Sequence, residues 1–170
     1  KRLDAGSWFD PRFAAERVPE LVEVLALTAG RSMLNIEIKA SAFEEDYPAD
    51  SIERQVARLC KEHRALDRVI VSSFDRRILA RIAAMDAPPA LAYISDHPAD
   101  QGVMDLLSEI NAFSWHPRFK VLTNDQVERM HAAGLKVFPW TINTREEAEK
   151  TLALGVDGLI CNELQVMRAM

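Results

Sequence analysis

Short apolar segments alternate with segments of helical periodicity along almost the whole chain, and this alternation restricts the fold more than any other feature. Apolar or β-branched runs that predict strands occupy segments 31–39, 67–74, 89–95, 112–116, 135–142 and 156–162. The segments between them place apolar residues at helical spacing, as Ile52, Val56 and Leu59 do within 48–65. Alternating strands and helices form parallel sheets joined by right-handed crossovers. We therefore expect an α/β fold with six parallel strands, in a single domain that spans residues 1–170.

Helix boundaries can be located from capping residues. Thr123 or Asn124 is suited to begin one helix, and Gly134 to end it. Thr144 and Gly155 have the same relationship in the next helix. These signals place the last predicted strands directly after glycines.

Two architectures are compatible with six parallel strands: an open doubly wound sheet, and an eight-stranded barrel that lacks two strands. The doubly wound fold typically carries a glycine-rich phosphate loop, but the six glycines are scattered and form no G-x-G-x-x-G motif. Charged and polar residues instead lie at the carboxyl ends of several predicted strands, among them Glu37, Lys39, Ser72, His116 and the segment that begins at Trp140. Because barrel enzymes build their sites at the carboxyl ends of the strands, this distribution favours the barrel.

Glu37 and Lys39 are the most unusual of these residues, because they interrupt the apolar segment 33–40. Residues two apart in a strand point to the same face. The pair can therefore be an ion pair at the edge of a core or one half of an active site. The spacing alone leaves both interpretations open.

Composition excludes several classes of function. Of the 170 residues, 48% are hydrophobic and 28% charged, which is ordinary for a globular protein. The net charge of −5 and the absence of a Lys/Arg-rich block argue against a nucleic-acid partner. No apolar run approaches the roughly 20 residues of a membrane helix, so we expect no membrane insertion. The two cysteines, Cys60 and Cys161, lack metal-binding spacing and favour a reducing, cytoplasmic location.

Four stretches in this order resemble the glycerophosphodiester phosphodiesterase family. They are LDAGSWFDPRFAAERVPELVEVL (3–25), LNIEIK (34–39), VIVSSFD (69–75) and VFPWTINTREEAEKTLALGVDGLI (137–160). The second is similar to the family's third strand, which ends in Glu-x-Lys. The fourth is similar to its Trp-Thr-Val-Asn strand and the Gly-Val-Asp-Gly segment that follows. Together they cover nearly the whole chain.

The resemblance implies a TIM-type (β/α)8 barrel that hydrolyses glycerophosphodiesters to an alcohol and glycerol 3-phosphate. It also implies a divalent cation, Mg²⁺ or Ca²⁺, held by carboxylates, with two histidines as general acid and base. On this basis Glu37 is expected to be a metal ligand and Lys39 to contact the phosphate. Trp140, Phe74 and His116 are expected to line the substrate cleft.

The sequence departs from the family in one large respect. The family's His-Arg, Glu-x-Asp and His-Asp motifs, which supply both histidines and two carboxylate ligands, do not occur in it. The six predicted strands correspond to the family's third to eighth. We therefore expect an incomplete barrel that binds the metal weakly and is weak or inactive as a catalyst. The alternative is a non-catalytic barrel remnant that pairs through exposed sheet edges with a partner chain or with itself.

Overall fold

The computed structural model describes residues 3–165 and contains one parallel sheet whose strands follow chain order. The strands are β1 (Leu34–Glu37), β2 (Val69–Ser73), β3 (Ala90–Ser95), β4 (Ser114–Pro117) and β5 (Lys136–Val137). Each strand pairs in parallel with the next. The predicted α/β class is confirmed, and within the described residues the sheet does not close on itself.

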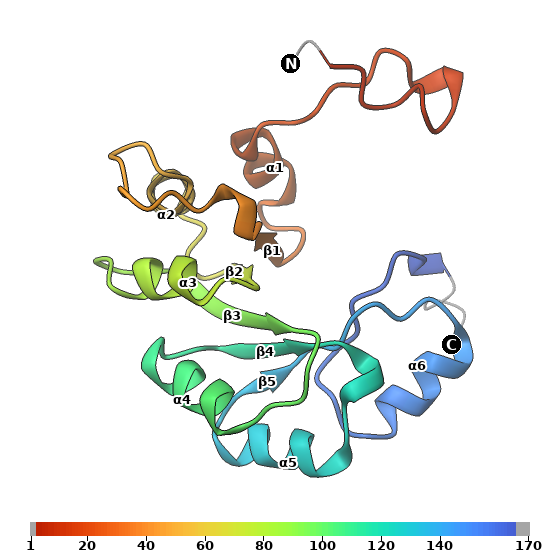
Figure 1. The fold of residues 1–170 in the computed structure, drawn as a ribbon. Coiled ribbons are helices and arrows are strands. Elements are labelled where there is room, and N and C mark those ends of the chain that lie inside the picture. Colours follow the sequence, from red (N-terminus) through yellow and green to blue (C-terminus); the bar gives the residue numbers. More distant parts are fainter. Residues whose placement is uncertain (1–2, 166–170) are drawn as a thin grey trace.

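Six α-helices are defined in this part of the chain, in regular alternation with the strands. They are α1 (Leu21–Thr28), α2 (Ile52–Glu62), α3 (Arg76–Ala83), α4 (Gln101–Glu109), α5 (Asn124–Ala132) and α6 (Arg145–Leu152). Figure 1 shows the elements following one another round an arc, with α2 to α5 on its outer side. The segment before α1 extends away from the sheet. Right-handed crossovers that always return on the same side produce this arrangement.

The core lies between the strands and these outer helices. Alternate strand residues face the helices and are almost fully buried, as Val71, Leu91 and Trp115 are. The next residues along each strand face the inside of the arc, because side chains alternate between the two faces of a sheet. The inner face is therefore left to residues outside the main hydrophobic core.

The helix boundaries agree with the capping signals in the sequence. The side chain of Thr123 accepts a hydrogen bond from the backbone of Gln126, and Thr144 has the equivalent role in α6. Gly134 and Gly155 adopt φ values of +76° and +81°, a region in which side chains with a Cβ are strained. These predicted ends are confirmed.

Strand β5 is shorter than the sequence pattern predicts. Beyond it, the Phe138 N–H donates to Trp115 O (3.0 Å) and the Trp140 N–H to Pro117 O (2.9 Å). A parallel ladder needs the N–H of residue 117 between these two bonds. Because proline has no N–H, the chain continues beside β4 without forming a regular strand.

The predicted sixth strand, 156–162, is not confirmed, and the described sheet has five strands rather than six. The segment still lies beside the chain that follows β5: the Asp157 N–H donates to Val137 O (3.1 Å), and the Ile160 N–H to Pro139 O (2.9 Å). Pro139 cannot donate in return. Between these two bonds the segment advances by three residues, from 157 to 160, while the chain opposite advances by two, from 137 to 139. This mismatch breaks the regular strand pairing.

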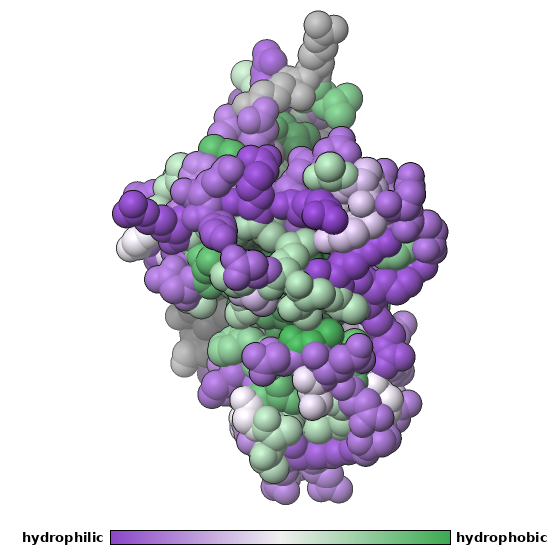
Figure 2. All heavy atoms as spheres, turned by 90° about the vertical axis from the view of Figure 1, so that its left-hand side faces the viewer, coloured by the Kyte–Doolittle hydropathy of each residue, from purple (hydrophilic) through white to green (hydrophobic). Residues whose placement is uncertain are grey.

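The side of the molecule that carries α2 and α3 is mostly hydrophilic, with small hydrophobic areas between the polar side chains (Figure 2). Among residues 3–165 no helix has both the length and the apolar character that crossing a membrane requires.

Candidate active site

Glu37 and Lys39 lie at the carboxyl end of β1 and form an ion pair, with 2.7 Å between Lys39 Nζ and Glu37 Oε1. The lysine side chain is 71% exposed and the glutamate side chain 30% exposed. Both point to the inside of the arc, as their spacing in the sequence predicts. The ion-pair interpretation is therefore confirmed for this structure, and it does not exclude a role in a site.

The two residues border a cavity of about 250 Å³ on the inner face of the sheet. The cavity is lined by Asn35, Glu37, Lys39, Phe74, Ile94, His116, Trp140, Thr141 and Ile160. These residues come from six separate parts of the chain, and most of them lie at or just beyond the carboxyl end of a strand. All five residues that the sequence singled out as site candidates are brought together here.

His116 forms the buried wall of this cavity. It is 2% exposed, its Nε2 lies 3.0 Å from Ser114 Oγ, and the Phe138 ring meets it edge-on with 5.5 Å between centroids. Its Nδ1 is buried and has no hydrogen-bond partner among the described residues. Burial disfavours the charged ring and lowers the pKa of His116 to about 4. The imidazole is therefore neutral at physiological pH.

Trp140 and Phe74 form the aromatic wall. Their rings meet edge-on with 5.6 Å between centroids, and Trp140 Nε1 donates to His116 O (2.9 Å). This bond fixes the indole against the end of β4. Phe74 is 41% exposed, which is unusual for a phenylalanine at the end of a central strand and indicates that its ring borders open space.

Sequence reasoning did not single out Ile94, Thr141 or Ile160 as cavity residues. Ile94 could have been found, because it is the register partner of His116 in the neighbouring strand. Ile160 could not, because its position depends on how the segment after α6 packs beside Pro139. A larger cavity of about 460 Å³ lies at the amino ends of the strands, but of the described residues that line it Glu109 alone is ionisable. The smaller cavity therefore has the chemistry of a site.

The comparison with family models decides between the candidate architectures. The model described as the glycerophosphoryl diester phosphodiesterase family matches residues 1–166. The chain belongs to this family. The family has the TIM-barrel fold, so the doubly wound alternative can be set aside.

Curated relatives support the assignment. A glycerophosphodiester phosphodiesterase of Caldanaerobacter subterraneus is 33% identical over 168 residues, which covers 98% of this chain and 67% of the relative. One from Bacillus altitudinis is 35% identical, with 94% and 64% covered. The chain thus spans about two thirds of the length of these glycerophosphodiester phosphodiesterases.

Solved structures agree with the fold. An Oleispira antarctica phosphodiesterase, in complex with the product sn-glycerol 3-phosphate, has a TM-score of 0.81 and 27% identity, covering 95% of this chain and 64% of that one. A glycerophosphodiester phosphodiesterase from Agrobacterium tumefaciens has a TM-score of 0.78 over 98% of this chain and 68% of that one. Because its identity is only 18%, the Agrobacterium structure supports the fold alone.

The family resemblance also implies a divalent cation, and the donors in the cavity can be tested against it. Ca²⁺ takes six to eight oxygen ligands, and Mg²⁺ takes six, of which proteins usually supply one or two as carboxylates. In the part of the chain that the structure describes, Glu37 is the only carboxylate that lines this cavity, and Asn35 is its only side-chain amide. Among residues 3–165 no group of three His, Cys, Asp or Glu side chains could hold a metal ion. The donor set therefore does not fit a complete site for Mg²⁺ or Ca²⁺.

Proposed function

We propose that this chain forms one side of the active site of a glycerophosphodiester phosphodiesterase, which hydrolyses glycerophosphodiesters to an alcohol and sn-glycerol 3-phosphate. One observation carries the proposal. The five residues expected from the family resemblance line a single cavity at the carboxyl ends of the strands, where barrel enzymes place their sites. The product bound to the Oleispira relative supports the substrate class.

Lys39 is the residue we assign to the phosphate. Among residues 3–165 it is the only cation that lines the cavity, and its ammonium is exposed enough to exchange Glu37 for another anion. A phosphodiester carries one negative charge, and charge accumulates on its oxygens as the bond to the leaving group breaks. A cation held at this position would stabilise that charge.

Glu37 is the residue we assign to the cation, as one ligand of an incomplete set. A single carboxylate binds Mg²⁺ or Ca²⁺ weakly, so we expect weak binding by this chain. When bound, the ion would neutralise phosphate oxygens. Without it, Glu37 keeps Lys39 in place through the 2.7 Å ion pair.

The remaining wall suits the uncharged part of the substrate. Phe74 and Trp140 offer ring surface to carbon atoms, and the neutral ring of His116 completes this wall of the cavity. A neutral histidine suits an uncharged group, because it places no second positive charge beside Lys39. We therefore place the glycerol moiety against these three side chains.

We expect little or no hydrolysis by the isolated chain. His116 is the only histidine among the described residues that lines the cavity. With a pKa of about 4 it is deprotonated at neutral pH and cannot protonate a leaving alkoxide there. A purified chain that cleaved glycerophosphocholine at rates typical of enzymes, with Mg²⁺ or Ca²⁺ added, would contradict this expectation.

Binding of the product tests the proposed site without requiring turnover. The full chain, labelled with ¹⁵N, is titrated with sn-glycerol 3-phosphate while the indole N–H signal of Trp140 is followed by NMR. We expect a saturable shift that glycerol alone does not produce at the same concentration. No shift of this signal at millimolar ligand would overturn the proposed site.

A second candidate function rests on the free edge of β1. Leu34 and Ile38 direct their N–H groups to β2, so Asn35 and Glu37 direct theirs away from it, and no described strand lies on that side. An open edge is a template for pairing with another strand. The alternative is therefore a module that completes its sheet with a partner chain or with a second copy.

The segment before α1, which extends away from the sheet, exposes hydrophobic side chains as well. Residues 4–17 form a loop closed by antiparallel pairing of Asp4 with Arg17, and the loop presents Trp8 (82% exposed) and Phe9 (70% exposed) to solvent. Large exposed aromatic side chains are typical of interaction surfaces. Native mass spectrometry distinguishes the two functions: a monodisperse monomer at high concentration would exclude self-pairing.

A further inference from the structure

Glu37 and Lys39 must be held accurately if they bind a phosphate, but they lie on the edge strand of the sheet and in the segment that follows it. A binding site loses much of its effect when its groups move by about 0.5 Å. Strand β1 is hydrogen-bonded on one side only, and it ends at Glu37. Something other than sheet pairing must therefore fix this part of the chain.

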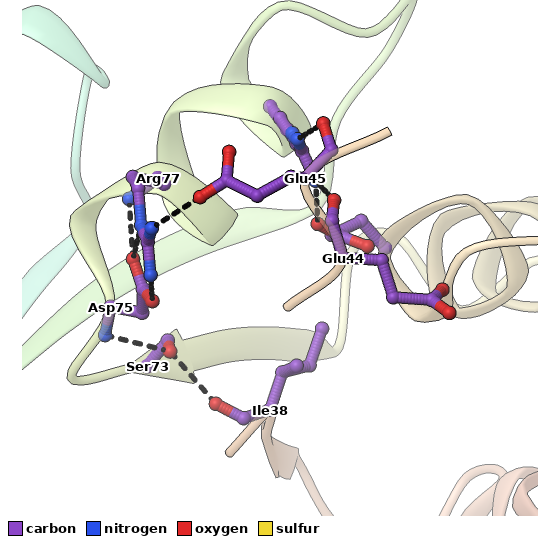
Figure 3. Close-up of polar contacts among 8 residues, drawn as sticks. Ile38, Glu44, Glu45, Ser73, Asp75 and Arg77 are labelled. Carbon is purple, nitrogen blue, oxygen red and sulfur yellow. Dashed lines mark hydrogen bonds and ion pairs between the residues drawn. The ribbon is translucent and has the colours of Figure 1, made fainter. Parts of the chain in front are cut away.

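The first anchor is on Ile38, between the two site residues. The Ile38 N–H donates to Ser72 O (2.9 Å), and the buried hydroxyl of Ser73 donates to Ile38 O (2.8 Å). The same hydroxyl accepts from the Asp75 N–H (3.0 Å), so it links β1 to the start of α3 (Figure 3). Ile38 is thus held at both its N–H and its carbonyl group.

The second anchor is Arg81 of α3, which contacts residues 43–47 in the segment after Lys39. Its guanidinium donates to Glu44 O (2.6 Å) and Glu45 O (3.0 Å) and lies 4.1 Å and 4.4 Å from the ring centroids of Phe43 and Tyr47. Two carbonyl groups and two aromatic rings of one short segment are therefore held by a single side chain.

A buried carboxylate keeps Arg81 in this position. Glu53 of α2 is fully buried, and its Oε1 lies 3.2 Å from Arg81 Nη1. A buried ion pair contributes little to stability compared with a well-packed apolar pair, so stability does not explain why this pair is present. Here it fixes the orientation of a flat, five-donor group that reaches the segment 43–47.

Arg77 connects the two anchors. It pairs with Asp75 (2.8 Å) and with Glu45 (3.1 Å), and its guanidinium lies 3.8 Å from the Phe43 ring centroid. Figure 3 shows this line of contacts from Ile38 through Ser73, Asp75 and Arg77 to Glu45. Lys39 therefore lies between two points that are tied to the same helix.

We propose that Arg81 is a positioning residue for Glu37 and Lys39, acting through the segment that it holds and not by contact with a ligand. The inference rests on the proposed function for its purpose, but the restraint itself can be measured separately. The positioning role requires that greater backbone mobility in residues 43–47 is accompanied by greater mobility in residues 38–42, which include Lys39.

The test is the substitution Arg81→Lys in the full chain. Lysine keeps the charge and most of the length but cannot bond two carbonyl groups in a fork or stack flat on two rings. Arg58→Lys on α2 is the matched control, because Arg58 is a helix arginine whose ion pair is with Glu62 of the same helix. Hydrogen exchange is followed by mass spectrometry over 38–47 and over β2.

We expect Arg81→Lys to accelerate exchange about tenfold over both 38–42 and 43–47, with β2 unchanged, because hydrogen bonds to a charged group are lost. The affinity for sn-glycerol 3-phosphate should fall several-fold, and Arg58→Lys should change neither measurement. Faster exchange over 43–47 alone, or an equal increase in β2, would overturn the positioning role.

The outcomes also separate the two proposals. If the parent chain does not bind sn-glycerol 3-phosphate, the proposed function fails, and the exchange pattern over 38–42 still decides whether Arg81 restrains Lys39. If the parent binds and Arg81→Lys binds equally well, the positioning role is wrong and the proposed function stands.

Discussion

The Lys39 ammonium lies 2.7 Å from the Glu37 carboxylate, at the rim of the cavity that His116, Phe74 and Trp140 also line. The pair is mostly solvated on the lysine side, so as an ion pair it adds little to stability. Its position relative to the aromatic wall matters more, because a ligand with one anionic and one apolar part can contact both. The ion pair also restrains the Lys39 ammonium at the rim of the cavity before a ligand binds.

The role of Lys39 predicts a loss of ligand binding with little loss of stability. Lys39→Met keeps the aliphatic length and removes the charge, and we expect affinity for sn-glycerol 3-phosphate to fall at least tenfold, since a hydrogen bond to a charged group contributes about 1.5–3 kcal/mol. Lys61→Met is the control, because Lys61 is an exposed lysine paired with Asp86 on the helix side. The NMR titration measures both. Equal affinities in the two variants would remove Lys39 from the site.

The free edge of β1 makes a prediction of its own. The Asn35 N–H points away from β2, so Asn35→Pro removes a donor from the edge and leaves the bonds to β2 in place. Edge pairing predicts that the parent chain and Asn35→Ala associate as concentration rises, whereas Asn35→Pro stays monomeric. Native mass spectrometry over a range of concentrations checks this. Association that persists in Asn35→Pro would assign the contact to another surface, such as the loop around Trp8.

The sequence predicts those features of the fold that depend on local patterns. The alternation of strands and helices, the caps at Thr123 and Thr144, and the shared face of Glu37 and Lys39 follow from periodicity and spacing, and all are confirmed. Local patterns do not reveal that a proline in one strand removes the donor that its neighbour needs. Pro117 therefore helped to shorten β5 from the neighbouring strand, in addition to Pro139 within the predicted segment 135–142 itself.

Contacts between distant residues were equally hidden. Nothing in the sequence around Arg81 indicates that its partners are a fully buried Glu53 and the carbonyl groups of a segment more than thirty residues earlier. A charged residue on an amphipathic helix is ordinarily solvated, and the pattern alone supports only that interpretation. The candidate site could be predicted because a family resemblance supplied it, whereas the contacts that hold it in place could not.

Asp157 predicts a loss of stability in strong acid. Burial by itself would raise the pKa of Asp157, but hydrogen bonds from Lys136, His131 and the backbone of Val137 lower it from 3.8 to about 2. A lowered pKa stabilises the folded state above pH 3.8, and this contribution is lost as the pH falls from 3.8 through 2. The difference corresponds to about 2 kcal/mol at neutral pH.

The measurement is urea unfolding of the parent and of Asp157→Asn between pH 7 and pH 2. We expect the substitution to cost about 2 kcal/mol at pH 7 and much less near pH 2. Asp86→Asn serves as the control, since the Asp86 side chain is 94% exposed. A cost of Asp157→Asn that did not change with pH would mean that the carboxylate contributes through shape and not through charge.

His116 predicts a second pH dependence, in a different window. Burial lowers its pKa from 6.5 to about 4, so between these values the unfolded chain binds a proton that the folded chain does not. Stability therefore falls as the pH drops from 6.5 to 4, by up to about 3 kcal/mol. His116→Gln removes the titrating group. Between pH 6.5 and 4 the free energy of unfolding of this variant should therefore fall less than that of the parent chain. The same window excludes His116 as a general acid at neutral pH.

Urea unfolding at pH 7, 5.5 and 4 measures the effect, and the ring signals of His116 in NMR report its protonation directly. His63→Gln is the matched control, because it removes an exposed histidine from the end of α2. We expect His116 to remain neutral at pH 5.5 in the parent chain. A ring that is charged at pH 5.5 would mean that the cavity admits water freely, and His116 would then have to be reconsidered as a proton donor to the leaving group.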